Sequence, residues 1–146
     1  MNKIETFWIS QAALIINDNK LLIVELANNP GYWDIPGGRI DVGEGDKSVD
    51  AFRREILEEI GVKKFDIIDI VDYDIWYVKK EKHTQGVCAL LFLIDNLDTY
   101  DINLSSEHIN YKWVAEAELG NDKYFWPGAT RMIKNGFKKY NQFKNN

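Results

Sequence analysis

The sequence predicts one α+β domain in which a helix interrupts two groups of strands and a second helix closes the chain. Residues 7–16, 21–26 and 65–78 are rich in β-branched, aromatic and aliphatic residues, which favours strands. Residues 49–60 and the region from residue 126 onward carry apolar side chains at helical spacing. No repeat and no linker separates these elements, so we expect residues 1–146 to form a single domain with an ordinary core.

Composition and charge narrow the functional classes. Apolar residues make up 45% of the chain and aromatic residues 13%, which is typical of a globular protein. The net charge of −5 and the lack of a basic stripe argue against binding to nucleic acid. Cys88 is the only cysteine, so an internal disulfide is excluded. The sequence has neither a signal-like start nor an apolar run long enough for a membrane span, and we expect a cytoplasmic protein.

The strands of the first half should lead into a glycine turn. Residues 17–20 have good turn chemistry, so the two strands around them should form a hairpin. After a loop and a short extended piece, Pro36, Gly37 and Gly38 indicate a backbone that bends sharply and approaches another group closely. In the second half, residues 86–94 are almost entirely apolar and predict a central strand buried on both faces, with Cys88 as a core thiol.

The helix that follows the glycine turn gathers three carboxylates on one side. Glu55, Glu58 and Glu59 are three or four residues apart and therefore share a face. Asp46 or Ser48 is expected to cap the start of this helix, and a glycine is expected to end it. A neighbouring face carries the apolar residues that should anchor the helix to the core, namely Val49, Phe52, Ile56 and Ile60. Gly61 is the glycine at its end.

Such a carboxylate face favours a bound divalent cation over a simple solvated surface. Glu58 and Glu59 lie in the last turn, where the helix dipole disfavours negative charge. Two like charges about 5 Å apart repel by roughly 3 kcal/mol at an effective dielectric constant of about 20, and a cation reverses that effect. The alternative is an acidic surface partly neutralised by Arg53 and Arg54. Oxygen ligands without His or Cys favour Mg²⁺ or Mn²⁺.

The same stretch resembles the signature of a known family. Residues 54–62 read Arg-Glu-Ile-Leu-Glu-Glu-Ile-Gly-Val, which is similar to the second half of the Nudix box. Gly38 and Glu44 match its first half, and residues 33–38 look like the run that often precedes it. The separation between Glu44 and Arg54 is two residues longer than in the family pattern. Either the loop carries an insertion, which we favour, or Asp46 replaces Glu44 as the loop acid.

The resemblance implies a Nudix-like α/β/α sandwich with a central mixed sheet. It also implies a metal site of Glu55, Glu58 and Glu59 with the Gly37 carbonyl. Arg54 would orient these carboxylates, and Glu44 would support Arg54. A further run, Glu-His-x-x-Tyr-x-Trp, begins at Glu107 and is similar to a stretch of several Nudix hydrolases in which a loop Glu completes the metal site or acts as the base.

The implied activity is a pyrophosphohydrolase that uses Mg²⁺ or Mn²⁺ to cleave a diphosphate linkage of a nucleoside diphosphate derivative by attack of water. Nucleoside triphosphates, dinucleoside polyphosphates, nucleotide sugars and a pterin triphosphate remain open as substrates. Either Glu55 or Glu107 would take the proton. Family members are often homodimers. His108 is a weaker candidate for a phosphate contact, and His83 is expected to be exposed.

Two other functions are less favoured. A catalytically inactive Nudix-fold nucleotide-binding or regulatory module would usually have lost acidic positions of the box, and this chain keeps them. An isoprenoid diphosphate isomerase would need a catalytic cysteine, whereas Cys88 lies within a predicted strand. Several aromatic residues could offer a stacking surface for a base, although most are more typical of core packing. They are Phe7, Trp8, Tyr32, Trp33, Trp76 and Tyr77.

Overall fold

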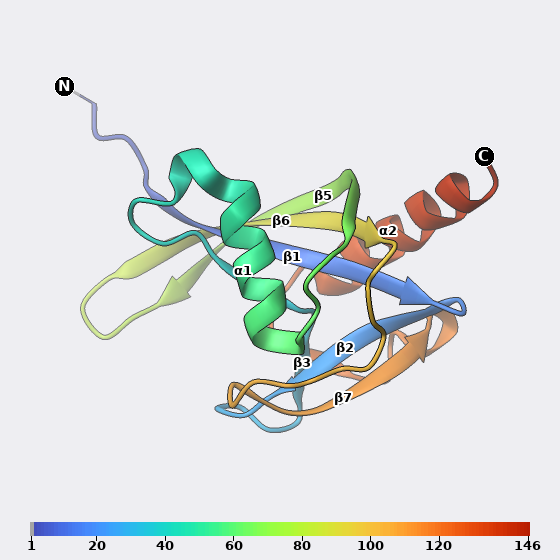
Figure 1. Ribbon diagram of the computed structural model, residues 1–146. Helices are drawn as coiled ribbons and strands as arrows, with labels where there is room; N and C mark the ends of the chain where they lie inside the picture. The colour runs from blue at the N-terminus through green and yellow to red at the C-terminus, as the bar shows by residue number, and fades with distance from the viewer. Residues whose placement is uncertain (1) are drawn as a thin grey trace.

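A computed structural model describes residues 2–146 (Figure 1). The strands are β1 (Phe7–Asn17), β2 (Lys20–Leu26), β3 (Tyr32–Asp34), β4 (Gly37–Arg39), β5 (Asp66–Lys79), β6 (Thr84–Asp95), β7 (His108–Ala115) and β8 (Lys123–Tyr124). The helices are α1 (Ser48–Ile60) and α2 (Ala129–Lys144), with short 3₁₀ turns at Gly45–Lys47 and Glu116–Glu118. The elements expected from the sequence are therefore present.

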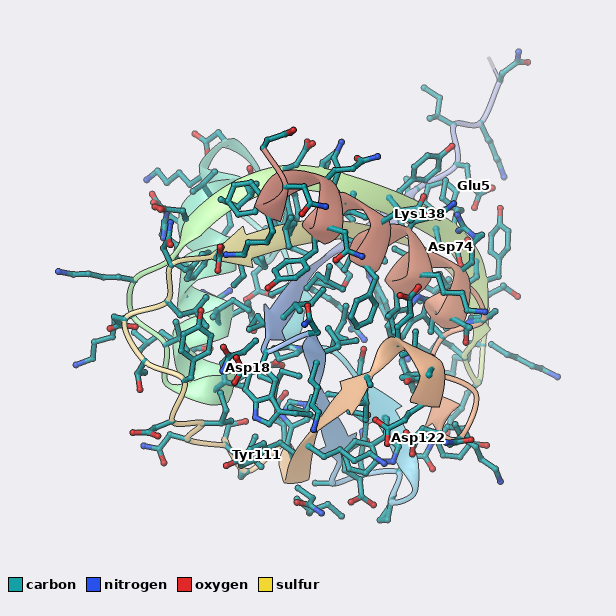
Figure 2. The ribbon with its side chains drawn as sticks, turned by 90° about the vertical axis from the view of Figure 1, so that its right-hand side faces the viewer. Glu5, Asp18, Asp74, Tyr111, Asp122 and Lys138 are labelled. Carbon is teal, nitrogen blue, oxygen red and sulfur yellow. The ribbon has the colours of Figure 1, made fainter. Side chains whose placement is uncertain are left out.

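All eight strands join one mixed sheet. Its order is β5-β6-β1-β2-β3-β8, with β4 paired to β1 and β7 paired to β2. The pairs β1–β6 and β3–β8 are parallel, and the other pairs are antiparallel. α1 covers one face of the sheet and α2 lies across the other (Figures 1 and 2). This arrangement is the mixed α/β/α sandwich that the sequence predicts.

The strands of the first hairpin separate soon after their turn, and the glycine turn pairs with the part of β1 that β2 does not cover. Asp18 and Asn19 have φ values of 49° and 58°, as a tight hairpin turn requires. β1 pairs with β2 only next to this turn, and elsewhere runs parallel to β6. The edge that β2 leaves free pairs with β4, where Gln11 faces Gly38 and Ala12 faces Gly37. The glycine turn therefore lies against the middle of β1.

Alternating residues of the strands form two cores. On the α1 side, Ala13 and Ile15 of β1 pack with Phe52, Ile56 and Ile60 of the helix, all of them nearly inaccessible to solvent. The core on the α2 side contains Leu14, Ile16, Leu21, Ile23, Leu91, Leu93, Met132, Ile133 and Phe137, among others. Since each core holds one helix against the shared sheet, the orientation of α1 is fixed relative to β4.

The sequence predicts the C-terminal end of α1 correctly but not the capping of its N-terminal end. Gly61 ends the helix with φ of 78°, and its N–H donates to the Leu57 carbonyl, as expected. The expected cap by Asp46 or Ser48 is wrong, because Lys47 is the N-cap residue and no side chain caps the helix. The 3₁₀ turn at Gly45–Lys47 runs directly into Ser48 and leaves no extended residue to act as a cap.

Two expectations about burial also need correction. Val49 is 50% exposed and does not anchor α1, whereas Ala51 in the same turn is buried. β6 lies between β5 and β1 in the sheet, but its side chains are not all buried. Cys88 and Leu90 are only half-buried, and they alternate with Leu91 and Leu93, which belong to the core on the α2 side.

The last helix lies close to the sheet. A Cβ atom at Gly136 would overlap the Leu14 side chain. Glycine at this position therefore lets α2 pack closely against β1. Asp74 of β5 lies beside the first turn of α2 (Figure 2) and pairs with Arg131 at 3.4 Å. Among residues 2–146, no helix is both long enough and apolar enough to cross a membrane.

Candidate active site

The glycine turn and the carboxylate face of α1 are in direct contact. The Gly37 N–H donates to Glu59 Oε2 at 2.8 Å. At Gly38, a Cβ atom would overlap the carboxyl group of Glu55, so only glycine lets that carboxyl group lie against the turn. The two halves of the sequence motif, which are separated by a loop, therefore meet at one place.

Arg54 lies at the centre of the acidic groups. Its Nη1 atom is 2.8 Å from Glu55 Oε1 and 3.1 Å from Glu58 Oε2. On the other side, Nε and Nη2 donate to the two carboxylate oxygens of Glu44 at 3.1 and 3.0 Å. These contacts lower the pKa of Glu44 and raise that of Arg54, which therefore remains charged. Arg53 instead binds Phe65, at the carbonyl oxygen and over the ring, and does not neutralise this face.

Glu44, and not Asp46, contacts Arg54 in this structure. Glu44 Oε2 also accepts the backbone N–H of Asp41 at 2.9 Å, which closes the loop on itself. Asp46 lies in the 3₁₀ turn and is exposed. The two additional residues therefore lengthen the connection to α1 without displacing Glu44 from Arg54.

Glu59 is the most deeply buried carboxylate of this group. It is 8% exposed, and burial raises its pKa to about 8 despite the hydrogen bond from Gly37, which lowers it. The negative charges of Asp34, Glu55 and Glu107 raise this pKa further. Burial likewise raises the pKa of Glu55, although Arg54 opposes the effect. In the metal-free protein these shifts favour the protonated, uncharged forms of Glu55 and Glu59.

The loop between β6 and β7 brings Glu107 to the end of α1. The backbone N–H groups of Asn103 and Ser105 each donate at 3.0 Å, to the carbonyls of Ile60 and Glu59 respectively. Glu107 comes two residues after Ser105 and is exposed, and its negative charge raises the pKa of Glu59. Figure 1 shows this loop passing the C-terminal end of the helix. The segment that leads to Glu107 is therefore tied by its backbone to the end of α1.

Asp34 is an acidic residue near Glu59 that the sequence pattern did not single out. It ends β3 and accepts the N–H of Ile35 at 2.8 Å. Burial raises its pKa to about 7, and its charge in turn raises the pKa of Glu59. The available signal was a single acidic residue between Trp33 and Ile35, both of which are buried.

The donor chemistry of the site fits a hard divalent cation. Its acidic side chains offer only carboxylate oxygens, the ligands that Mg²⁺ and Mn²⁺ prefer. Among residues 2–146, no three acidic, His or Cys side chains already converge to hold an ion. Arg54 holds Glu55 and Glu58, and Gly37 holds Glu59, so a cation would have to draw these side chains away from their present partners.

The remaining candidates have distinct surroundings. His83 is exposed in the β5–β6 turn, as expected. His108 begins β7 and is 8% exposed, and its buried Nδ1 has no hydrogen-bond partner among the residues described. Among the aromatic residues, Trp33 is buried in the core, whereas Tyr77 is 56% exposed with its ring 6.1 Å from that of Phe7. Only part of this aromatic set is therefore available to a ligand.

The chain belongs to the Nudix family, and is a Nudix hydrolase. The family model described as the NUDIX domain matches residues 7–136, which include the glycine turn, α1 and Glu107. The nucleoside triphosphatase NudI of Salmonella paratyphi B is 32% identical over 116 residues, covering 73% of this chain and 80% of that protein. The same protein of Salmonella newport matches equally well.

Solved structures agree with this assignment. The MutT protein from Methanosarcina mazei is 27% identical, with a TM-score of 0.73 over 96% of this chain and 99% of that one. A Caenorhabditis elegans Ap4A hydrolase has a TM-score of 0.67 at 20% identity, over 91% and 96% of the two chains. The second likeness concerns the fold alone.

Proposed function

We propose that this protein hydrolyses the diphosphate linkage of nucleoside triphosphates in a reaction that depends on Mg²⁺ or Mn²⁺. The observation that carries the proposal is the contact between the two halves of the motif, in which Gly37 binds Glu59 and Gly38 leaves room for Glu55. The choice of nucleoside triphosphates follows the name of the relative at 32% identity. Dinucleoside polyphosphates and nucleotide sugars are the alternatives to be compared.

In this proposal Glu55, Glu58 and Glu59 hold the cation, together with the Gly37 carbonyl and Glu107. The bound ion neutralises charge on the diphosphate and lowers the pKa of the attacking water. Arg54 orients the carboxylates through the charge-assisted hydrogen bonds described above, and Glu44 holds Arg54 in turn. An exposed aromatic surface around Phe7 and Tyr77 is a place where a nucleobase can stack.

Two carboxylates can take the proton from water, Glu55 and Glu107. Replacing each by Gln separates their roles when kcat is measured over a range of Mg²⁺ concentrations. Loss of the base lowers kcat at every metal concentration, whereas more metal partly compensates for the loss of a ligand.

The function is tested by incubating the wild-type protein with nucleoside triphosphates, dinucleoside polyphosphates and nucleotide sugars, with Mg²⁺, with Mn²⁺ or with EDTA. Identification of the products by chromatography shows which linkage is cleaved. We expect a nucleoside monophosphate and pyrophosphate from a triphosphate, and no reaction with EDTA. Equal turnover in EDTA, or no turnover on any of these compounds, would overturn the proposal.

A further inference from the structure

Ser105 connects the carboxylate helix to the segment that carries Glu107. Its N–H donates to the carbonyl oxygen of Glu59 at 3.0 Å. Its Oγ atom accepts the N–H of Glu107 at 3.3 Å, and its carbonyl accepts the N–H of His108 at 3.3 Å. One half-buried residue thus contacts the backbone of two residues whose side chains belong to the site.

Other hydrogen bonds fix the chain on both sides of this link. Asn103 is tied to Ile60 at the end of α1, and the carbonyl of Glu107 accepts the N–H of Ala27 at 2.9 Å. Between these anchors, the Ser105 hydroxyl makes the only side-chain hydrogen bond to the Glu107 backbone within residues 2–146. Such a bond from residue i to residue i+2 restricts the local backbone conformation.

We propose that Ser105 is a positioning residue that directs the Glu107 carboxylate toward Glu59. The proposal rests on the proposed function, because it matters only if Glu107 serves the metal or the attacking water. The two hydrogen bonds of Ser105, to the Glu59 carbonyl and from the Glu107 N–H, tie the backbones of these two residues together and support the proposal. A side chain that orients a metal ligand through its backbone acts as outer-shell partners do, and removing such partners commonly lowers metal affinity or activity about 10- to 100-fold.

The chain offers a matched control. Ser106 is the adjacent residue, is exposed, and its side chain makes no hydrogen bond within residues 2–146. The set of variants is therefore Ser105→Ala, Ser105→Thr, Ser106→Ala, Glu107→Gln and the double variant Ser105→Ala with Glu107→Gln. Each is measured for Mg²⁺ binding by calorimetry, for kcat and half-saturating Mg²⁺ in triphosphate hydrolysis, and for its melting temperature.

We expect Ser105→Ala to weaken Mg²⁺ binding and to raise the half-saturating Mg²⁺ concentration by about tenfold. Ser105→Thr retains the hydroxyl group and should restore both values, and Ser106→Ala should match the wild type. In the Glu107→Gln background, Ser105→Ala should add little, because both changes remove the same carboxylate contribution. If Ser105 had only a structural role, Ser105→Ala would lower the melting temperature. Its effect on Mg²⁺ binding would then be the same in the wild type and in Glu107→Gln.

Unchanged Mg²⁺ binding and kinetics in Ser105→Ala, full additivity with Glu107→Gln, or an equal effect of Ser106→Ala would each overturn the proposal. Failure of the proposed function is separately visible in the wild type, which would then neither bind Mg²⁺ nor hydrolyse a triphosphate. That outcome overturns the role of Ser105 as well.

Discussion

At the scale of single residues, the site is defined by carboxylates that the fold keeps close together at a cost. Glu59 is buried beside Asp34, Glu55 and Glu107, and its pKa is raised to about 8 as a result. Asp34 shows the same effect, with a pKa of about 7. Strongly perturbed pKa values of buried acidic groups cluster at functional sites. The expected consequences are therefore specific to individual side chains.

Glu59→Gln should remove turnover while the protein remains folded. The amide keeps the size of the side chain and can still accept the Gly37 N–H, but it loses the charge that holds a cation. We expect a loss of at least about 1,000-fold in kcat/KM, equivalent to ~4 kcal/mol. The measurement is kcat/KM at saturating Mg²⁺, with circular dichroism as the folding control. Near-wild-type turnover would remove Glu59 from the site.

Glu44→Gln should reduce activity much more than Asp46→Asn. Glu44 accepts two hydrogen bonds from Arg54, whereas Asp46 lies exposed in a 3₁₀ turn and does not cap α1. Loss of the paired contact should lower kcat/KM by about 10- to 100-fold, and Asp46→Asn should stay within about twofold. Kinetics of the two variants at saturating Mg²⁺ provide the comparison, and the reverse order would assign the loop position to Asp46.

At the scale of elements, much of the site could be predicted because it lies on one helix. The spacing of Glu55, Glu58 and Glu59 fixes a common face once a helix forms. By contrast, Asp34 and Ser105 come near Glu59 only through the fold, in which a long loop is hydrogen-bonded to the end of α1 and the charge of Asp34 acts on Glu59. Neither position follows from the periodicity of its own segment.

The errors at the start of α1 have the same origin. Asp46 has the residue type of a good cap, but the two additional loop residues form a 3₁₀ turn and Lys47 takes the cap position. Val49 fits the apolar spacing, yet its side chain is 50% exposed. Local pattern predicts the helix, and tertiary contacts decide which of its residues are covered.

Gly61→Ala tests the junction between α1 and the loop that carries Glu107. Gly61 has φ of 78°, and an added Cβ would lie 2.9 Å from Asn103 Cβ. We expect a loss of about 1–2 kcal/mol in the free energy of unfolding, together with reduced activity as the loop shifts. Gly45→Ala is the control, because a Cβ there meets no atom within 4 Å. Chemical denaturation of both variants gives the result, and equal stability would refute the close packing.

At the scale of the whole molecule, stability and metal binding should be linked through pH. Asp34 and Glu59 have folded-state pKa values above those of an unfolded chain. Their protonated forms therefore stabilise the fold fully below about pH 4, and this contribution is lost progressively as pH rises to about 7 for Asp34 and to about 8 for Glu59. A cation bound only by the folded protein opposes that loss by mass action, and protons compete with it at lower pH.

The melting temperature of the metal-free protein should accordingly fall between about pH 5 and about pH 9. Added millimolar Mg²⁺ should raise it at neutral and alkaline pH, with an effect that fades on acidification. Thermal unfolding with EDTA or Mg²⁺ across this range provides the measurement. Glu59→Gln is the internal control and should show a weaker dependence on pH. An identical pH profile for this variant would contradict the assignment of the raised pKa.

The central claim is that the carboxylates of α1 and the glycine turn bind a divalent cation. Its most direct test is a Mn²⁺ titration of the wild type and of Glu59→Gln at about pH 8, with the free ion measured by electron paramagnetic resonance. We expect saturable binding to the wild type and binding at least about tenfold weaker in the variant. Equal binding to the two proteins, or no binding to the wild type, would contradict it.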